Sequence, residues 1–279
     1  KAVIDLASEQ TGLDIPALCF EENDKLNITE YTQICMLAVE AAIYQAIIDK
    51  GITPDVTAGL SLGEYGALIA SGAMTMADAF AVVRKRGIYM QEAVPTGGAM
   101  TAVLGLDPQV IEDICKKTVD ETNSVVSVAN YNCPGQIVIT GEKAAVDTAA
   151  AACSEAGAKR CVPLKVSGPF HSAMLKGAGE KLADALESVE IHDIKVPYIT
   201  NVTADYVKSP ADVKDYLTQQ VSSSVRWQQT IERLIADGAD EFVEIGPGRS
   251  LSGFMRKINR DVKVVNIDKL EDFEKYVNR

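Results

Sequence analysis

The sequence has few histidines, no C-x-x-C pair and no excess of positive charge, and each lack excludes a class of function. Two histidines and six scattered cysteines provide no set of zinc ligands at ordinary spacing. The formal net charge of −12 argues against nucleic acid and against an anionic membrane surface as partners. No apolar run approaches the roughly 18 residues that span a bilayer, and no signal-like segment opens the chain. We therefore expect a cytoplasmic protein that uses no metal or other cofactor and no membrane.

Helix-like and strand-like segments alternate along most of the chain, which is typical of a parallel sheet covered by helices on both faces. The apolar spacing predicts helices at 2–10, 29–50, 62–70, 75–93, 172–189, 211–220, 228–237 and 251–258, and a short one at the end. Strands are predicted at 55–60, 198–202, 241–245 and 263–267. The expected fold class is α/β, with an α/β-hydrolase-like core.

Residues 97–167 differ in pattern from the segments on either side. They predict strands at 100–106, 125–129, 136–140 and 159–166, helices at 108–117 and 144–156, and a turn-rich segment at 130–135. The order β-α-β-β-α-β is the ferredoxin-like pattern. We expect a small ferredoxin-like domain at 97–167, inserted into a large α/β domain made of residues 1–96 and 168–279.

The segment Gly59-Leu60-Ser61-Leu62-Gly63 follows a predicted strand and contains G-x-S-x-G. This pattern is the nucleophile elbow, in which a serine sits on a strained turn between a buried strand and a helix. A side chain at either glycine is expected to collide with the crowded turn, whereas glycine leaves the serine hydroxyl exposed. Ser61 is therefore the candidate nucleophile.

A serine nucleophile needs a base, and the chain offers two histidines. His192 stands in the polar run Glu190-Ile191-His192-Asp193, which is typical of a surface residue. His171 stands in Gly168-Pro169-Phe170-His171-Ser172, where the predicted insertion ends and a helix begins. A helix cap or a core histidine would fit that place too, but by elimination His171 is the better candidate for the base.

Arg86 points inward on the predicted helix 75–93. On a helical wheel it falls among the apolar residues Val82, Val83 and Met90. A buried guanidinium is costly without a partner. Arg86 therefore pairs either with an internal carboxylate or with the carboxylate of a substrate, and its fork-shaped set of donors suits the second.

Gln220 ends the predicted helix 211–220. Helix ends leave backbone carbonyls unpaired and carry a partial negative charge. The Gln220 carbonyl could hold the ring N–H of a histidine as the acid of a triad does, although an ordinary polar helix end fits the same pattern.

Six motifs occur along the chain between about residues 30 and 260. They are Gly59-Leu60-Ser61-Leu62-Gly63-Glu64-Tyr65, Arg86-Gly87-x-x-Met90-Gln91, Asn132-x-Pro134-Gly135-Gln136, Gly168-Pro169-Phe170-His171-Ser172, Val225-Arg226-Trp227 and Glu244-x-Gly246-Pro247-Gly248. In combination they resemble the malonyl-CoA:acyl carrier protein transacylases of type II fatty acid synthesis. The resemblance implies a ping-pong transfer of malonyl from malonyl-CoA to the phosphopantetheine thiol of acyl carrier protein, through a malonyl-serine.

The resemblance also implies a role for each matching residue. Ser61 would be the nucleophile, His171 the general base and acid, and the Gln220 backbone carbonyl the group that orients His171. The Leu62 backbone N–H would form half of the oxyanion hole. Arg86 would bind the malonyl carboxylate.

Three further residues would line the substrate site by the same resemblance, namely Phe170, Leu60 and Asn132. The ring of Phe170 would fill the space that a 2-methyl branch needs, which favours malonyl over methylmalonyl by only about 1 to 3 kcal/mol. Leu60 departs from the family, which usually has histidine before the nucleophile, and we expect this to tune the activity without abolishing it.

A second departure concerns the family's first strand and its Gly-Gln-Gly turn, which this sequence does not contain. That turn would supply the second oxyanion N–H, and losing one such donor typically costs about 10²- to 10³-fold in rate. We therefore expect the sequence as printed not to be a complete active enzyme.

Two other classes of function compete with the acyltransferase. An α/β-hydrolase-type esterase or thioesterase also has G-x-S-x-G, but its histidine follows the last strand, whereas His171 precedes predicted strands. A non-catalytic domain that only docks the carrier protein is the other alternative.

The expected partners are malonyl-CoA and an acidic acyl carrier protein, and the protein is expected to be a monomer. Because the enzyme is itself acidic, the carrier should dock on a local basic patch near His171. The candidates are Lys159, Arg160, Lys165, Lys176 and Lys181. Scattered solvated lysines would fit that pattern as well.

Overall fold

The fold is a mixed α/β arrangement, taken from a computed structural model that describes residues 1–166 and 168–279. The helices are α1 (Ala2–Thr11), α2 (Ile15–Phe20), α3 (Thr29–Ile48), α4 (Gly63–Ser71), α5 (Met76–Ala93), α6 (Pro108–Thr122), α7 (Lys143–Glu155), α8 (Lys176–Glu187), α9 (Val213–Gln220), α10 (Trp227–Ala236), α11 (Ser250–Ile258) and α12 (Leu270–Val277). The strands are β1 (Thr57–Ala58), β2 (Gly98–Leu104), β3 (Val126–Cys133), β4 (Gln136–Glu142), β5 (Arg160–Pro163), β6 (Tyr198–Ile199), β7 (Glu241–Ile245) and β8 (Lys263–Ile267). Short 3₁₀ helices are η1 (Lys25–Asn27), η2 (Ala173–Leu175) and η3 (Pro210–Asp212).

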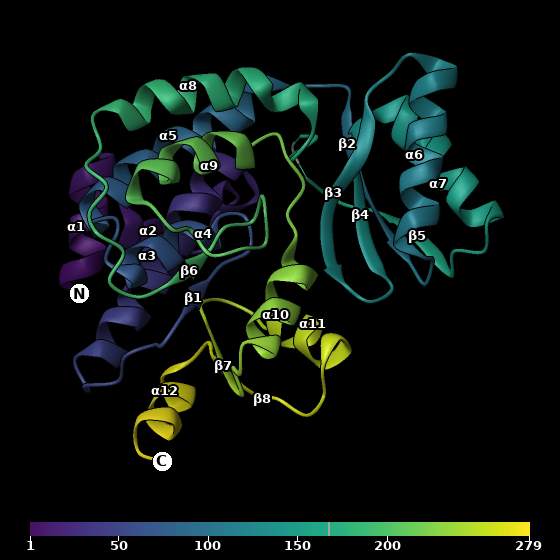
Figure 1. Cartoon of the computed structure of the whole chain (residues 1–279). Coiled ribbons are helices and arrows are strands. Elements are labelled where there is room, and N and C mark those ends of the chain that lie inside the picture. Colours follow the sequence, from purple (N-terminus) through teal and green to yellow (C-terminus); the bar gives the residue numbers. More distant parts are fainter. Residues whose placement is uncertain (167) are drawn as a thin grey trace.

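The helices α1 to α5, α8 and α9 gather around the short strands β1 and β6 in one part of the molecule (Figure 1). Their buried apolar side chains form the largest continuous core. Helix α5 packs against α3 and also against α8. Because α8 follows His171 and α5 carries Arg86, this packing brings together two residues that lie far apart in the sequence.

The strands of this part are shorter than expected and do not form one continuous parallel sheet. Strand β1 pairs in parallel with β6, and β7 pairs in parallel with β8, but among the described residues the two pairs are separate sheets. The strands predicted at 55–60 and 198–202 shrink to two residues each. The residues that follow each strand, 59–61 and 200–201, are instead joined by side-chain hydrogen bonds of Asn201 to Ser61 and Gly59.

The segment between α5 and η2 forms a four-stranded antiparallel sheet with the strand order β3-β4-β2-β5. Helices α6 and α7 cover this sheet and share a core with it, on the right of Figure 1. The turn expected at 130–135 is wrong over most of its length, because β3 continues to Cys133. Tertiary pairing explains the difference: the Val225 N–H donates to the Ala129 carbonyl and the Tyr131 N–H donates to the Val225 carbonyl.

Helix α3 corrects the expectation that no segment is long and apolar enough to span a bilayer. By length and composition it passes that test, with a mean hydropathy of 1.3 over its most apolar window. In the fold, however, α3 packs against α1, α2, α4 and α5. Its apolar character is explained by this burial, and core helices commonly pass the same test.

Candidate active site

Ser61 lies at the turn between β1 and α4 and has a φ of 53°, in the left-handed region that only a few non-glycine residues adopt. The turn needs glycine at only one of the two flanking positions. A Cβ on Gly59 would lie 1.9 Å from the Gly63 carbonyl oxygen, whereas a Cβ on Gly63 would meet no described atom within 4 Å. The expectation that both glycines avoid a collision is therefore correct for Gly59 and wrong for Gly63.

The Asn201 side chain holds the elbow in this strained shape. Its Oδ1 accepts a hydrogen bond from the Ser61 backbone N–H at 2.5 Å, and its Nδ2 donates to the Gly59 carbonyl at 2.6 Å. Asn201 is fully buried and lies two residues after the end of β6, the neighbour of β1. One amide thus satisfies a donor and an acceptor that the tight turn would otherwise leave unpaired.

His171 lies against Ser61, with 2.8 Å between its Nε2 and the Ser61 Oγ. Its Nδ1 lies 2.9 Å from the backbone carbonyl oxygen of Gln220, at the end of α9. Because a carbonyl oxygen only accepts, Nδ1 must carry the proton and Nε2 is left to accept from the serine hydroxyl. His171 also has a positive φ of 61°, so both members of the pair are held in strained backbone conformations.

The surroundings of His171 favour its neutral form. Burial and the positive charge of Arg86 lower its pKa to about 4, while the hydrogen bonds with the Gln220 and Ser223 backbones act in the opposite direction. At neutral pH the imidazole is therefore neutral, and its Nε2 can take a proton from Ser61.

Arg86 is 1% exposed and lies under the same two residues. Its Nη2 donates to the Ser61 Oγ at 3.2 Å and to the Gln220 Oε1 at 2.9 Å, and its Nη1 donates to the Gln33 Oε1. The Nε–H has no partner among the described residues. A guanidinium has five N–H donors, so Nε–H and one N–H of Nη1 stay available. Burial lowers the pKa of Arg86, while the nearby Tyr65 and Glu64 raise it.

Glu64 is the carboxylate of this hydrogen-bond network, and among the described residues it connects to Arg86 through Gln220. The Glu64 Oε2 accepts from the Gln220 Nε2 at 2.7 Å and from the Asn201 backbone N–H at 3.0 Å. Burial raises the pKa of Glu64, and these hydrogen bonds and the charge of Arg86 counteract the rise. Of the two alternatives for Arg86, a direct internal ion pair is therefore not what the described residues form.

The other predicted site residues lie in more ordinary surroundings. The Leu62 backbone N–H has no hydrogen-bond acceptor in the part of the chain that the structure describes. Leu60 packs with the cluster that contains Trp227. Phe170 packs against both the large helical core and a smaller cluster on the antiparallel sheet.

Two polar residues do not join the Ser61 cluster. Asn132 is buried on β3, and within residues 1–166 and 168–279 it makes no hydrogen bond to the cluster. His192 is partly exposed and faces Glu190 at 3.7 Å, in agreement with the prediction of a surface residue.

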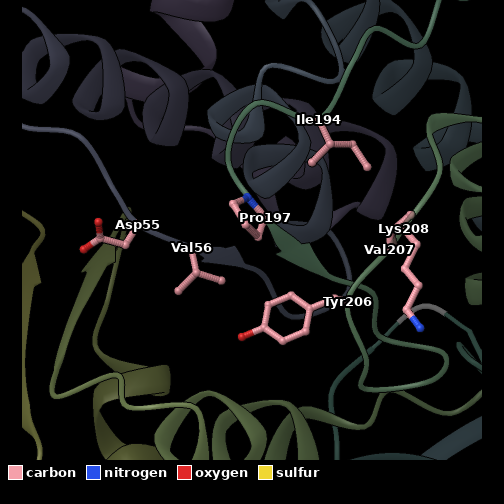
Figure 2. A pocket seen from close by; sticks show the side chains of 7 residues that line it. All are labelled: Asp55, Val56, Ile194, Pro197, Tyr206, Val207 and Lys208. Carbon is pink, nitrogen blue, oxygen red and sulfur yellow. The ribbon is translucent and has the colours of Figure 1, made fainter.

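A cavity of about 420 Å³ lies apart from this chemistry, beside the start of β1 (Figure 2). Its lining comes from residues 55–56, from Ile194 and Pro197 and from residues 206–208, and none of the predicted site residues lines it. The candidate active site is therefore the Ser61 cluster, whose geometry suits a serine that forms an ester by attack on a carbonyl and is served by a neutral histidine.

Comparison with known proteins agrees with this chemistry, since the acyl transferase domain family matches residues 5–267. The chain belongs to the acyl transferase domain family. It is 45% identical over 276 residues to the malonyl CoA-acyl carrier protein transacylase of Bacillus subtilis, covering 98% of this chain and 87% of that protein. The crystal structure of MCAT from Streptococcus pneumoniae has a TM-score of 0.95 and 45% identity, covering 99% of this chain and 90% of that one.

A third similar acyl transferase was solved together with a carrier protein. It is a malonyl-transacylase in complex with its type II PKS acyl-carrier protein, with a TM-score of 0.96 and 38% identity, covering 99% of this chain and 90% of that one. Strong likeness to these enzymes extends over nearly the whole of this chain.

Sequence reasoning about this acyl transferase missed three residues of the site, namely Gln33, Glu64 and Asn201. Gln33 is a polar residue on the buried face of α3, which is the same signal that pointed to Arg86. Asn201 follows the strand next to the elbow strand, and the carboxyl ends of neighbouring parallel strands meet at one edge. Glu64 gave no separate signal, because an acidic residue in the first turn of a helix is common.

Proposed function

We propose that this acyl transferase moves a malonyl group from malonyl-CoA to the phosphopantetheine thiol of acyl carrier protein. The observation that carries the proposal is the buried Arg86, which touches the Ser61 Oγ and keeps two N–H donors for a substrate carboxylate. An arginine in that place would be unfavourable in the acyl pocket of an enzyme for neutral esters. The names of the similar enzymes from Bacillus subtilis and Staphylococcus aureus agree with malonyl transfer.

In the first half-reaction, the Ser61 Oγ would attack the thioester carbonyl while its proton passes to the His171 Nε2. The tetrahedral intermediate then collapses, the C–S bond breaks, and the coenzyme A sulfur leaves with the proton from His171. Malonyl remains on Ser61 as an ester. The Leu62 N–H would stabilise the oxyanion and is the one donor of the oxyanion hole that we assign within the described residues.

The second half-reaction runs the same steps in reverse with a different thiol. His171 takes the proton of the carrier's phosphopantetheine thiol, the sulfur attacks the malonyl-serine ester, and the serine oxygen leaves with that proton. Arg86 would hold the malonyl carboxylate throughout, so that the ester carbonyl stays in place for the incoming thiol. The Gln220 carbonyl would keep the His171 ring turned toward Ser61.

Phe170, Leu60 and Asn132 would shape the rest of the substrate site. Phe170 lies between the large core and the antiparallel sheet, so its ring could limit the space next to the malonyl methylene. Asn132 would act from β3. The neighbouring residues Ala129 and Tyr131 pair with Val225, five residues after Gln220.

We also propose the finer classification of the fold. The strand order β3-β4-β2-β5 with two covering helices supports a ferredoxin-like small domain at 97–167, and the elbow supports an α/β-hydrolase-like large domain at 1–96 and 168–279. The boundary at residue 167 lies outside the described residues.

Carrier docking would use basic side chains near His171. The five candidates are all exposed, and none forms an ion pair within residues 1–166 and 168–279. Lys181 lies over the ring of Tyr89 and the Lys159 stem packs on Gly105, so of the four lysines Lys165 and Lys176 are the least engaged among the described residues. Exchanging these two for glutamate should slow transfer to the carrier while leaving acylation by malonyl-CoA unchanged.

Three further expectations accompany this function: the enzyme works as a monomer, in the cytoplasm, and without a cofactor. Sedimentation would test the first, fractionation of the producing cells the second, and activity after exhaustive dialysis against a chelator the third.

The proposal is tested by intact-mass spectrometry of the complete protein, with the family's first strand and Gly-Gln-Gly turn included, after incubation with malonyl-CoA and then addition of acyl carrier protein. A malonyl adduct should form, be absent in Ser61→Ala, and be discharged onto the carrier thiol. An adduct that persists in Ser61→Ala, or one that water removes faster than the carrier does, would contradict the proposal.

A further inference from the structure

Glu64 connects the residue that holds the backbone of the nucleophile, Asn201, with the residue that orients the arginine, Gln220. It is the second residue of α4, directly after the elbow, and it is wholly buried. A single oxygen, Oε2, accepts the Asn201 backbone N–H at 3.0 Å and the Gln220 Nε2 at 2.7 Å. Neither bond contacts the reacting atoms, and each leads to a different part of the site.

The first bond leads to the nucleophile. Asn201 holds the elbow through its side chain, which accepts from the Ser61 N–H and donates to the Gly59 carbonyl. Because Glu64 fixes the backbone N–H of the same residue, it fixes the place from which that side chain reaches. A shift of the Asn201 backbone would therefore move Ser61.

The second bond leads to the arginine. The side-chain amide of Gln220 is nearly symmetrical in shape, and its two ends differ only in whether they donate or accept. Glu64 is an acceptor, so it draws the Nε2 end, which also donates to the Ser61 carbonyl at 3.0 Å. The Oε1 end is thereby turned toward Arg86, where it accepts from Nη2. With the amide reversed, an NH₂ group would face the guanidinium and repel it.

We propose that Glu64 is a positioning residue, whose Oε2 holds together the residue that fixes Ser61 and the residue that orients Arg86. This inference rests on the proposed function, because Arg86 is given the substrate carboxylate to bind. Glu64 acts by the reach and acceptor character of its oxygen. It touches no substrate atom.

Two substitutions of Glu64 distinguish the effect of its side-chain length from the effect of its negative charge. Glu64→Gln keeps the length of the side chain, and its amide oxygen can accept both hydrogen bonds through two lone pairs. Glu64→Asp keeps the charge but withdraws the oxygen by one methylene. Since a misplacement of about 1 Å at a reacting centre can cost about 10²-fold in rate, we expect Glu64→Asp to lose about 10- to 100-fold in malonylation and Glu64→Gln to stay within about 3-fold of the wild type.

General destabilisation of the fold would lower both acylation rates together, so the informative measurement is the selectivity for malonyl over acetyl. Rates of acylation by malonyl-CoA and by acetyl-CoA are measured by intact mass, and the malonyl-to-acetyl ratio should fall in Glu64→Asp, because acetyl has no carboxylate for Arg86 to hold. Ser71→Ala is the matched control, since Ser71 is also a buried polar residue of α4, and among the described residues its hydroxyl bonds only to the Leu68 carbonyl and the Ala73 N–H. Its ratio should equal that of the wild type.

Three results would overturn the assignment: Glu64→Asp at the wild-type rate and ratio, equal losses with both acyl groups, or a Glu64→Gln variant as impaired as Glu64→Asp. Failure of the proposed function is distinguishable, because the wild type itself would then form no malonyl-serine.

Discussion

Arg86 and Arg233 lie in opposite surroundings: Arg86 is buried at the elbow, whereas Arg233 is on the surface near Tyr206, one of the residues that Figure 2 labels. Arg233 is 43% exposed, pairs with Asp205 at 3.1 Å and Asp237 at 2.7 Å, and lies over the ring of Tyr206, which lines that cavity. Arg86 has no carboxylate against it among the described residues and contacts two amides and a hydroxyl.

The two arginines differ in whether the protein itself provides a carboxylate partner. An exposed pair in water contributes little to stability, and the protein itself provides both of its partners. A buried guanidinium with neutral partners is costly, and such an arrangement persists where function uses it. Under the proposed function, the elbow region would use its positive charge to bind a substrate carboxylate, whereas the charge of Arg233 is balanced by the protein's own carboxylates.

The largest expected effect comes from removing the buried arginine. Arg86→Ala should lower the rate of acylation by malonyl-CoA by about 10²- to 10³-fold, because truncating one member of a buried hydrogen-bonded charge pair costs several kcal/mol. The measurement is the initial rate of adduct formation by intact mass. Arg84→Ala is the control on the same helix, since Arg84 pairs with Glu30 away from Ser61. Equal losses in both variants would break the comparison.

The elbow can also be disturbed without changing any charge. Gly59→Ala would drive a Cβ into the Gly63 carbonyl and should cost about 3 kcal/mol or more in unfolding free energy, because backbone cannot move aside cheaply. Gly63→Ala should stay within about 0.5 kcal/mol of the wild type, because its Cβ meets nothing. Chemical denaturation compares the two. A costly Gly63→Ala would show that both glycines are needed after all.

The charge of Arg86 should also be visible in the pH dependence of His171. With a pKa of about 4, the folded enzyme keeps a neutral base, so kcat/KM for acetyl-CoA should fall only as the pH approaches 4. Replacing Arg86 by glutamine removes one cause of the low pKa, and the acidic limb should move to higher pH. An unchanged limb would mean that burial alone sets the pKa of His171.

The same low pKa predicts an effect on stability. Below its ordinary pKa of 6.5 the histidine binds a proton in the unfolded chain, but in the folded protein it does so only near pH 4. The unfolded state is therefore favoured as the pH falls from about 6.5 to about 4. His171→Asn should lose less stability over this window than the wild type, measured by denaturation at each pH. If both proteins lost the same stability between pH 6.5 and pH 4, groups other than His171 would cause the acid sensitivity.

The smallest effect is expected at the surface. Arg233→Gln should leave malonylation unchanged and shift the thermal midpoint little, because its two carboxylate partners are solvated. A large loss of malonylation activity in Arg233→Gln would contradict the view that only Arg86, of these two arginines, takes part in the reaction.

The sequence predicted the places of most helices but not their exact ends, and it predicted the strands β7 and β8 to the residue, because apolar periodicity and turn residues act locally. It also pointed to two contacts that the structure contains. Elimination favoured His171 as the partner of Ser61, whereas the helix end left the role of the Gln220 carbonyl open and the resemblance assigned it. The sequence did not predict the full length of β3, because pairing with Val225 overrides the local turn signals.

The side-chain network under the elbow could not be predicted from the sequence. The Gln220 amide, Glu64 and Asn201 come from three distant segments, and their bonds depend on how α4, α9 and the loop after β6 pack together. Burial of polar residues at apolar positions is a local signal that singled out Arg86. It does not say which acceptor each donor finds.

The central claim is that the charge of Arg86 serves the substrate carboxylate, and one ratio tests it most directly. The rates of acylation by malonyl-CoA and acetyl-CoA are measured for the wild type and for Arg86→Ala. The account predicts a strong preference for malonyl in the wild type and, in the variant, a loss of that preference with the acetyl rate equal or higher. A variant that loses both rates in the same proportion, and so keeps the ratio, would contradict it.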